Sequence, residues 1–497
     1  MKIELTKTSQ SESVLVAFAV NAKQGKESRL KLTHLELGQR LKSAIEDKEL
    51  SPQPLETVLF RDIQFDGFRH VLVVGVSEKP QHEHIRQLAA SVHGALKSAK
   101  TSSALIHFDG LPHSKKDSAS FLQALTEGLL LTNYSFDELK TKKKDKDTPK
   151  EILVRIQTKT ASEATMKRAF HEAHILAESV NFSRRLGDMP GNLMTPTILA
   201  NTVLAAVKGT GIKATVWDKA RIKKEKMGGL LGVSNGSDQE PRFIILEYKG
   251  APASKKPICF VGKGLTFDCG GISIKPSASM EEMKYDMCGG ANVLGATLAI
   301  AKMKLKVNLI CLVPSTENLV SGSATKPGDV HFARNGKSFE VNNTDAEGRL
   351  ILADALCYAS EQKPQIIIDA ATLTGAIVVA LGNTHTGYFT RDKALKKKVE
   401  TAADHSGEWV WNMPLTDFHV KDMKGTYADL SNISASKGAG SATAAAFLEQ
   451  FVEPGIPWAH FDIAGTAWSV GSRLPYCPKK GASGAMVRTF VELAKQF

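Results

Sequence analysis

The sequence is poor in cysteine, and none of its cysteines is spaced as a metal-binding or redox pair. Six occur among 497 residues with no C-x-x-C motif, namely Cys259, Cys269, Cys288, Cys311, Cys357 and Cys477. This scattering argues against a disulfide framework and against zinc–thiolate chemistry. We therefore expect free or buried thiols in a reducing compartment.

Long apolar segments are also missing. No run reaches the ~18–20 apolar residues that a membrane helix needs, and the stretch that begins at Met1–Lys7 lacks the apolar segment of a signal peptide. The sequence therefore predicts a cytoplasmic protein.

Two common catalytic signatures are incomplete. The string His171-Glu172-Ala173-His174 is one residue shorter than H-E-x-x-H. A phosphate loop ending at Gly336-Lys337-Ser338 would need a glycine five positions earlier, where His331 stands.

Negative charge is in deficit over the whole chain. Lysine and arginine number 64 against 52 acidic residues, which gives a formal net charge of +12. A basic surface attracts nucleic acid or acidic partners. We interpret this charge as a solvated, lysine-rich surface, and nucleic-acid binding stays open as an alternative.

Apolar strand-like runs alternate with helical patterns from end to end, which indicates an α/β protein. A chain of 497 residues is too long for one core. We expect two domains: a smaller N-terminal α/β domain at 1–160 and a larger C-terminal α/β/α domain with a mixed central sheet at 161–497. The lysine-rich stretch at 140–150 is predicted to be a loop.

Individual elements follow from the same patterns. Predicted strands are Val14–Val20, His70–Val76, Ser103–Phe108, Glu151–Gln157, Phe243–Tyr248, Pro257–Val261, Val307–Val313, Gln365–Asp369 and Ala459–Ile463. Predicted helices are Ile85–Ser98, Ser118–Leu131, Ser162–Arg185, Thr197–Lys208, Ala291–Met303, Gly348–Ser360, Ser441–Phe451 and Ala482–Lys495.

Four carboxylates, two lysines and an arginine are concentrated in two clusters. The first cluster spans Val261–Met287 and the second spans Asn343–Leu350. The candidate ligand acids of the two clusters are Asp268, Asp286, Asp345 and Glu347. Like charges ~4 Å apart repel by ~4 kcal/mol even at an effective dielectric constant of about 20. Such a set either takes up protons or binds cations, and two divalent ions would balance four charges.

The local pattern places these acids where α/β proteins bind ligands. Lys263 and Asp268 are expected in a glycine-rich loop after the strand Pro257–Val261, beyond its carboxyl end. Asp345 and Glu347 are expected in an extended segment, where an i, i+2 pair points to one side. No histidine lies in either cluster, which favours Mg²⁺ or Mn²⁺, although Zn²⁺ also accepts carboxylate oxygen. A lysine amine can join such a site only when it is neutral.

These motifs resemble the leucine (cytosol) aminopeptidases. The segment Asn343-Thr344-Asp345-Ala346-Glu347-Gly348-Arg349-Leu350 matches the family signature, and four further segments match in order: Val261–Gly264 through Lys275–Ser277, Lys284–Met287, Asp369–Ala376 and Trp458–Gly465. The resemblance covers roughly residues 160–497. It implies a C-terminal catalytic domain and a dinuclear Zn²⁺ or Mn²⁺ exopeptidase.

The resemblance also implies a role for each polar residue. Metal ligands would be Lys263, Asp268, Asp286, Asp345 and Glu347, with Asp268 and Glu347 bridging the two ions. Lys275 and Arg349 would be the catalytic pair outside the ligand set. A bicarbonate ion near Arg349 would act as general base.

Substrate contacts follow from the same resemblance. Asp286 would contact the free N-terminal amine of a peptide, which an internal peptide bond does not offer. Backbone contacts would come from Thr372, the Leu373 carbonyl and Gly375. An apolar pocket for the first side chain would be lined by Met283, Ala464 and Ala467, and simple core packing explains these three equally well.

The family further implies a homohexamer that removes N-terminal leucine and other, mostly apolar, N-terminal residues from peptides. Two alternatives stay open. One is an additional role as a nucleic-acid-binding transcriptional or recombination regulator. The other is a catalytically inactive relative, against which the complete set of polar residues argues.

Overall fold

The computed structural model describes residues 1–8, 12–24, 27–47, 49–141 and 151–497. The chain divides into two compact units, Met1–Glu178 with Leu474–Pro478, and Ser179–Arg473 with Lys479–Phe497. The predicted helix from Ser162 is α5, Ala164–Asp188. The domain boundary near 160 stays a prediction, and most of the predicted loop at 140–150 lies outside the described residues.

The first unit is built on a seven-stranded sheet in the order β1-β7-β6-β2-β5-β4, with β3 paired to β2. Its strands are β1 Lys2–Thr6, β2 Val14–Gln24, β3 Glu27–Leu32, β4 Thr57–Phe60, β5 His70–Val76, β6 Ser103–His107 and β7 Leu153–Gln157. Its helices are α1 Leu35–Arg40, α2 Lys42–Glu46, α3 His82–Ser98 and α4 Ser118–Thr132, with the 3₁₀ turn η1 Phe108–Gly110.

Both faces of this sheet are buried because apolar residues occupy consecutive positions along its strands. In β2, Val14, Val16 and Phe18 face a core shared with α3 and α4. Leu15 and Ala17 face the opposite core. Successive side chains of a strand point to opposite faces of the sheet, so a strand that is apolar at consecutive positions must be packed against other elements on both faces. This confirms the α/β class for the first unit.

The second unit contains a mixed nine-stranded sheet in the order β17-β16-β19-β15-β10-β12-β9-β8, with β11 paired to β12. Its strands are β8 Ile212–Trp217, β9 Arg242–Lys249, β10 Ile258–Gly262, β11 Gly264–Asp268, β12 Asn308–Asn318, β15 Ile366–Ala371, β16 Thr386–Phe389, β17 Val410–Asn412 and β19 Trp458–Asp462. A small sheet joins β13 Asp329–Phe332, β14 Ser338–Val341 and β18 Leu430–Ser431.

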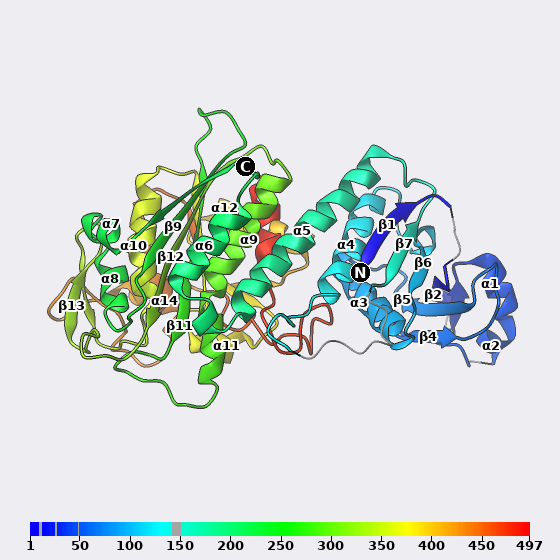
Figure 1. The fold of residues 1–497 in the computed structure, drawn as a ribbon, viewed down its shortest axis with the longest axis horizontal. Helices are drawn as coiled ribbons and strands as arrows, with labels where there is room; N and C mark the ends of the chain where they lie inside the picture. Colours follow the sequence, from blue (N-terminus) through cyan, green and yellow to red (C-terminus); the bar gives the residue numbers. More distant parts are fainter. Residues whose placement is uncertain (9–11, 25–26, 48, 142–150) are drawn as a thin grey trace. The chain divides into compact units, whose positions relative to one another are not determined.

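Helices cover the two faces of the nine-stranded sheet (Figure 1). The helices of this unit, with its 3₁₀ turns, are η2 Gly191–Leu193, α6 Pro196–Ala206, α7 Lys219–Lys224, α8 Gly228–Ser234, η3 Met280–Met287, α9 Cys288–Lys302, α10 Gly348–Glu361, α11 Gly375–Leu381, α12 Lys393–Ser406, α13 Asp417–Lys421, α14 Gly440–Glu449 and α15 Val487–Ala494. Cys259 and Val261 of β10 share a core with α8, α10 and α14. Phe260 points the other way and meets Phe490 of α15, which packs on α9.

Two local predictions differ from the structure. Asp268 ends a short strand, β11, that pairs in parallel with β12, whereas the glycines around it predicted a loop. The helix predicted from Ala482 begins only at Val487, because Gly484 and Met486 both take positive φ angles that an α-helix cannot contain. No helix among the described residues combines the length and apolarity needed to cross a bilayer.

Candidate metal centre

The two sequence clusters meet at one edge of the nine-stranded sheet. β10 ends at Gly262 and is followed at once by Lys263, while Asp268 ends β11. Asp286 comes from η3, and Glu347 is the residue that precedes α10. Parallel strands bring their carboxyl ends to one edge of a sheet, which is where open α/β sheets bind ligands.

The segment that carries Asp345 and Glu347 is a turn and not the extended stretch that the sequence predicted. The amide of Ala346 donates to the carbonyl of Asn343 at 3.2 Å, and Glu347 already has helical backbone angles. Both carboxylates still reach the cluster: Asp345 contacts Lys275, and Glu347 contacts Lys263.

Two lysine amines divide the four carboxylates between them. Lys263 Nζ lies 2.7 Å from Asp286 Oδ2 and 2.8 Å from Glu347 Oε1. Lys275 Nζ lies 2.8 Å from Asp268 Oδ2 and 2.5 Å from Asp345 Oδ1. Oxygens of Asp268, Asp286 and Glu347 lie within 4.8 Å of one another. The structure thus brings together all five predicted metal ligands and Lys275.

Burial makes this concentration of charge costly. It raises the pKa of Glu347 to about 8, with a further contribution from Asp268. Burial and Asp268 raise the pKa of Asp286 as well, against the opposing effect of Lys263. The pKa of Lys263 is lowered by burial but raised more by the carboxylates of Asp286 and Glu347, so that it ends above its ordinary value.

The cluster fits divalent cations. Glu347 is 2% exposed, and its Oε2 has no hydrogen-bond partner among the described residues. Four carboxylates face two lysine amines, so negative charge is in excess and one buried oxygen faces no donor. A buried polar atom without a partner costs free energy. An oxygen-rich set suits Mn²⁺ or Zn²⁺, and Lys263 could join it once bound cations displace the proton of its ammonium group.

Arg349 lies in the first turn of α10 and is also buried. Its Nη1 donates to the carbonyl of Asn432 at 2.6 Å, and its Nε has no hydrogen-bond partner among the described residues. Burial lowers the pKa of Arg349 to about 10, despite the opposing effect of Glu347. The guanidinium therefore keeps its positive charge at neutral pH, with donor capacity left for an anion.

One of the predicted substrate-contacting segments is attached directly to the cluster. Thr372 Oγ1 donates to Asp286 Oδ1 at 2.6 Å, and the Thr372 carbonyl accepts from Lys263 Nζ at 3.0 Å. The next residue, Leu373, donates its amide to Asp462 Oδ1 at 3.1 Å. Gly375 begins α11, and no atom lies within 4 Å of the position that a Cβ would take there.

Among the remaining predicted pocket residues, Ala464 is tied to the Leu373 segment, because its amide also donates to Asp462 Oδ1, at 3.3 Å. No hydrogen bond or ion pair among the described residues joins Met283, Ala464 or Ala467 to the five ligands. Ala467 is fully buried, whereas Met283 and Ala464 are half-buried. Their role as a pocket stays a prediction.

Sequence reasoning missed two polar residues that organise the site. Asp462 accepts from the Leu373 amide and from Thr374 Oγ1, so it holds the segment that carries Thr372. Asn318 donates to Asp268 Oδ1 at 2.8 Å. Both residues end apolar strands, β19 and β12. A polar residue at the carboxyl end of a buried strand is the signal that could have found them.

The fold and the cluster together define an α/β protein with a site of carboxylates and lysines that is suited to a pair of cations. The chain belongs to the cytosol aminopeptidase family: the model of its catalytic domain matches residues 181–491, and that of its N-terminal domain matches residues 14–143. The resemblance drawn from the motifs is confirmed. The chain is therefore an aminopeptidase, a hydrolase that acts on peptides.

Individual relatives agree with this assignment. A probable cytosol aminopeptidase of Bdellovibrio bacteriovorus is 68% identical over 486 residues, which cover 97% of this chain and 96% of the relative. One from Burkholderia pseudomallei is 42% identical over 434 residues, 87% of this chain and 84% of the relative.

Solved structures show the same fold. A tomato leucine aminopeptidase mutant superposes with a TM-score of 0.87 at 31% identity, covering 100% of this chain and 97% of the other. The bottromycin maturation enzyme BotP in complex with Mn gives a TM-score of 0.84 at 29% identity, covering 98% and 99%.

Proposed function

We propose that this aminopeptidase is metal-dependent and removes leucine and other, mostly apolar, N-terminal residues from peptides. The observation that carries the proposal is the cluster of four carboxylates, three of them buried, in which Glu347 Oε2 has no hydrogen-bond partner among the described residues. The Mn-bound relative supports a divalent metal. Two Zn²⁺ or Mn²⁺ ions would be held by Lys263, Asp268, Asp286, Asp345 and Glu347.

When bound, such a metal pair supplies a water of lowered pKa and polarises the scissile carbonyl. The residues of the chain supply binding and charge. Asp286, fixed by Thr372 Oγ1 at 2.6 Å, would face the N-terminal amine of the peptide. This contact would restrict cleavage to the first peptide bond, because internal bonds carry no ammonium group.

Lys275 would stabilise the negative charge that develops on the carbonyl oxygen. Burial lowers the pKa of Lys275, but the carboxylates of Asp268 and Glu347 raise it by more than burial lowers it. The amine is therefore protonated at neutral pH and can donate a hydrogen bond. Arg349, with its free donor capacity, would hold the bicarbonate ion that serves as general base. Backbone contacts would come from Thr372, Leu373 and Gly375.

Replacing one of the proposed ligand carboxylates tests this proposal. Glu347→Gln and Asp268→Ala are expected to lower hydrolysis of leucine amide by at least 10³-fold, because each removes charge that the ions require. Asp354→Asn is the matched control, since Asp354 is a fully buried carboxylate of α10, the helix that follows Glu347, and lies outside the cluster. A purified, folded Glu347→Gln protein with most of the original activity would refute the proposal.

A further inference from the structure

Asn318 lies beside the Asp268 carboxylate, on the neighbouring strand. β11 and β12 run parallel, and Asp268 and Asn318 are paired in register at the ends of the two strands. Asn318 is only 4% exposed. Its amide is therefore held at the sheet edge where the proposed ligands converge.

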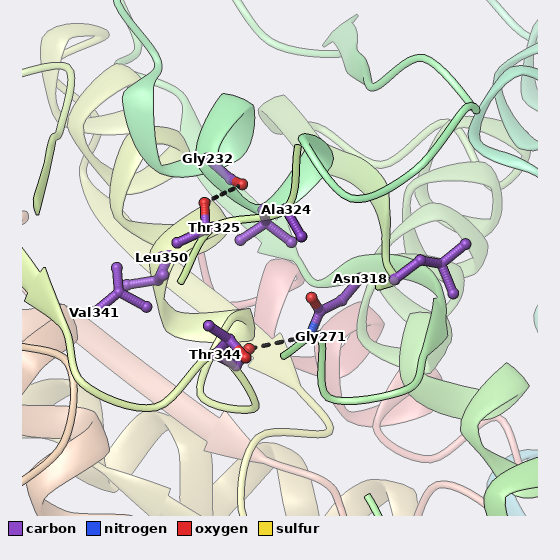
Figure 2. A pocket seen from close by; sticks show the side chains of 10 residues that line it. Gly232, Gly271, Asn318, Ala324, Thr325, Val341, Thr344 and Leu350 are labelled. Carbon is purple, nitrogen blue, oxygen red and sulfur yellow. Dashed lines mark hydrogen bonds between the residues drawn. The ribbon is translucent and has the colours of Figure 1, made fainter. Parts of the chain in front are cut away.

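The amide group donates into two segments that carry proposed ligands. Asn318 Nδ2 lies 2.8 Å from Asp268 Oδ1 and 3.0 Å from the carbonyl oxygen of Thr344. Figure 2 shows the second of these bonds, which reaches the residue just before Asp345. One NH₂ group thus ties the end of β11 to the turn that carries Asp345.

These contacts distinguish the two oxygens of Asp268. Oδ1 accepts from Asn318 and, at 2.9 Å, from the backbone amide of Gly270. Oδ2 faces the cluster, 2.8 Å from Lys275 Nζ. With Oδ1 engaged by two donors, Oδ2 is the oxygen that Asp268 can offer to a cation.

The orientation of the amide is fixed by its surroundings. A flipped amide would set its oxygen against two acceptors, which excludes that arrangement. A side chain at Gly271 would place its Cβ 2.7 Å from Asn318 Oδ1, and Gly271 has a φ of +64°. The cavity that Gly271, Asn318 and Thr344 line measures about 10 Å³, room for about one water molecule. The amide therefore has little space to move.

We propose that Asn318 is a positioning residue for the metal centre. It turns Asp268 so that Oδ2 alone faces the ions, and it keeps the Asp345 turn aligned with β11. This inference rests on the proposed function, because it assigns Asn318 to the same metal site. Partners that orient ligands in this way change metal affinity by about 10–100-fold when they are removed.

The test compares two asparagines of one strand. Asn308, at the opposite end of β12, also donates twice through Nδ2, to the carbonyls of Pro252 at 2.9 Å and Lys255 at 2.8 Å. Chelator-treated wild type, Asn318→Ala and Asn308→Ala would be titrated with Mn²⁺, with free Mn²⁺ followed by electron paramagnetic resonance. Asn318→Leu, nearly equal in shape, covers the case in which the alanine variant does not fold.

We expect both asparagine variants to unfold at lower temperature than wild type. Only the Asn318 variants should bind Mn²⁺ more weakly, by about 10–100-fold, while Asn308→Ala binds as wild type does. Wild-type affinity in a folded Asn318 variant would overturn the role of Asn318 and leave the proposed function standing. A wild-type protein that binds neither Mn²⁺ nor Zn²⁺ would overturn both.

Discussion

The two lysines of the cluster differ in burial and in hydrogen bonding. Lys263 and Lys275 each contact two carboxylates, yet their surroundings differ, since the Lys263 side chain is 3% exposed and that of Lys275 is 22% exposed. Lys263 also bonds to the Thr372 carbonyl deep in the site. This difference agrees with a ligand role for Lys263 and a substrate-facing role for Lys275.

Lys275→Ala separates these two roles. It should lower kcat for leucine amide by about 10²–10³-fold, the effect of removing one donor to a developing oxyanion, while two metal ions per chain remain bound. Turnover kinetics and elemental analysis measure the two quantities. Lys326→Ala, which removes an exposed lysine that pairs with Asp329, serves as control. Loss of metal from Lys275→Ala would make that lysine a ligand.

Asp354 provides a test of charge burial outside the cluster. It accepts from the Leu230 amide at 2.9 Å and from the Arg334 amide at 2.8 Å. Burial nevertheless raises its pKa from the ordinary 3.8 to about 7. The folded state therefore holds this proton more tightly than the unfolded state does. Its contribution to stability is largest below pH 3.8 and is lost as the pH rises toward 7.

Asp354→Asn should remove this pH dependence. Between pH 4.5 and 7.5 the wild type is expected to lose about 3 kcal/mol more of its free energy of unfolding than the variant does. The variant should be less stable at low pH, because its amide cannot accept from both backbone donors. Denaturant unfolding at several pH values measures the difference. Parallel pH profiles for the two proteins would show that Asp354 is ionised in the folded state.

At the level of elements, close approach of α10 to Lys263 shapes the site. Gly348 is the first residue of α10, and a Cβ there would lie 2.6 Å from Lys263 Cε and 2.7 Å from its Nζ. Lys263 cannot give way without leaving Asp286 and Glu347. A glycine at this position is thus required by the site and not by the helix.

Gly348→Ala should therefore reduce function more than stability. We expect at least a 10-fold lower kcat/KM for leucine amide with a nearly unchanged unfolding temperature, because alanine favours the helix itself. Gly322→Ala is the control, since nothing lies within 4 Å of a Cβ there. Equal kcat/KM values for the two variants would contradict this account.

The elements that sequence predicted well are those set by apolar periodicity. His70–Val76 is β5 with the predicted bounds, and the helix predicted from Gly348 is α10. β11 was missed because its pairing with β12 depends on tertiary contact, whereas the glycines in and around it favour a loop. The turn at Asp345 was missed because side-chain hydrogen bonds hold it: Asn343 Oδ1 accepts from the Asp345 amide, and Asn318 Nδ2 donates to the Thr344 carbonyl.

For the whole molecule, the motifs predicted the candidate site better than its supporting contacts. The signature at Asn343–Leu350 pointed directly to Asp345 and Glu347, which remain proposed ligands, because cation binding restricts residue type and spacing. Asp462 lies in the matching segment Trp458–Gly465, but residue type and spacing revealed neither its role nor that of Asn318, since both roles depend on strand pairing. The homohexamer, the cytoplasmic location and nucleic-acid binding stay predictions.

The central claim is that paired divalent ions in this pocket drive peptide hydrolysis. The most direct measurement is a titration of chelator-treated protein with Mn²⁺, in which bound ions and leucine amide hydrolysis are followed together. We predict no activity without ions and full activity as binding reaches two ions per chain. Full hydrolysis by protein that holds no metal ion would contradict the claim.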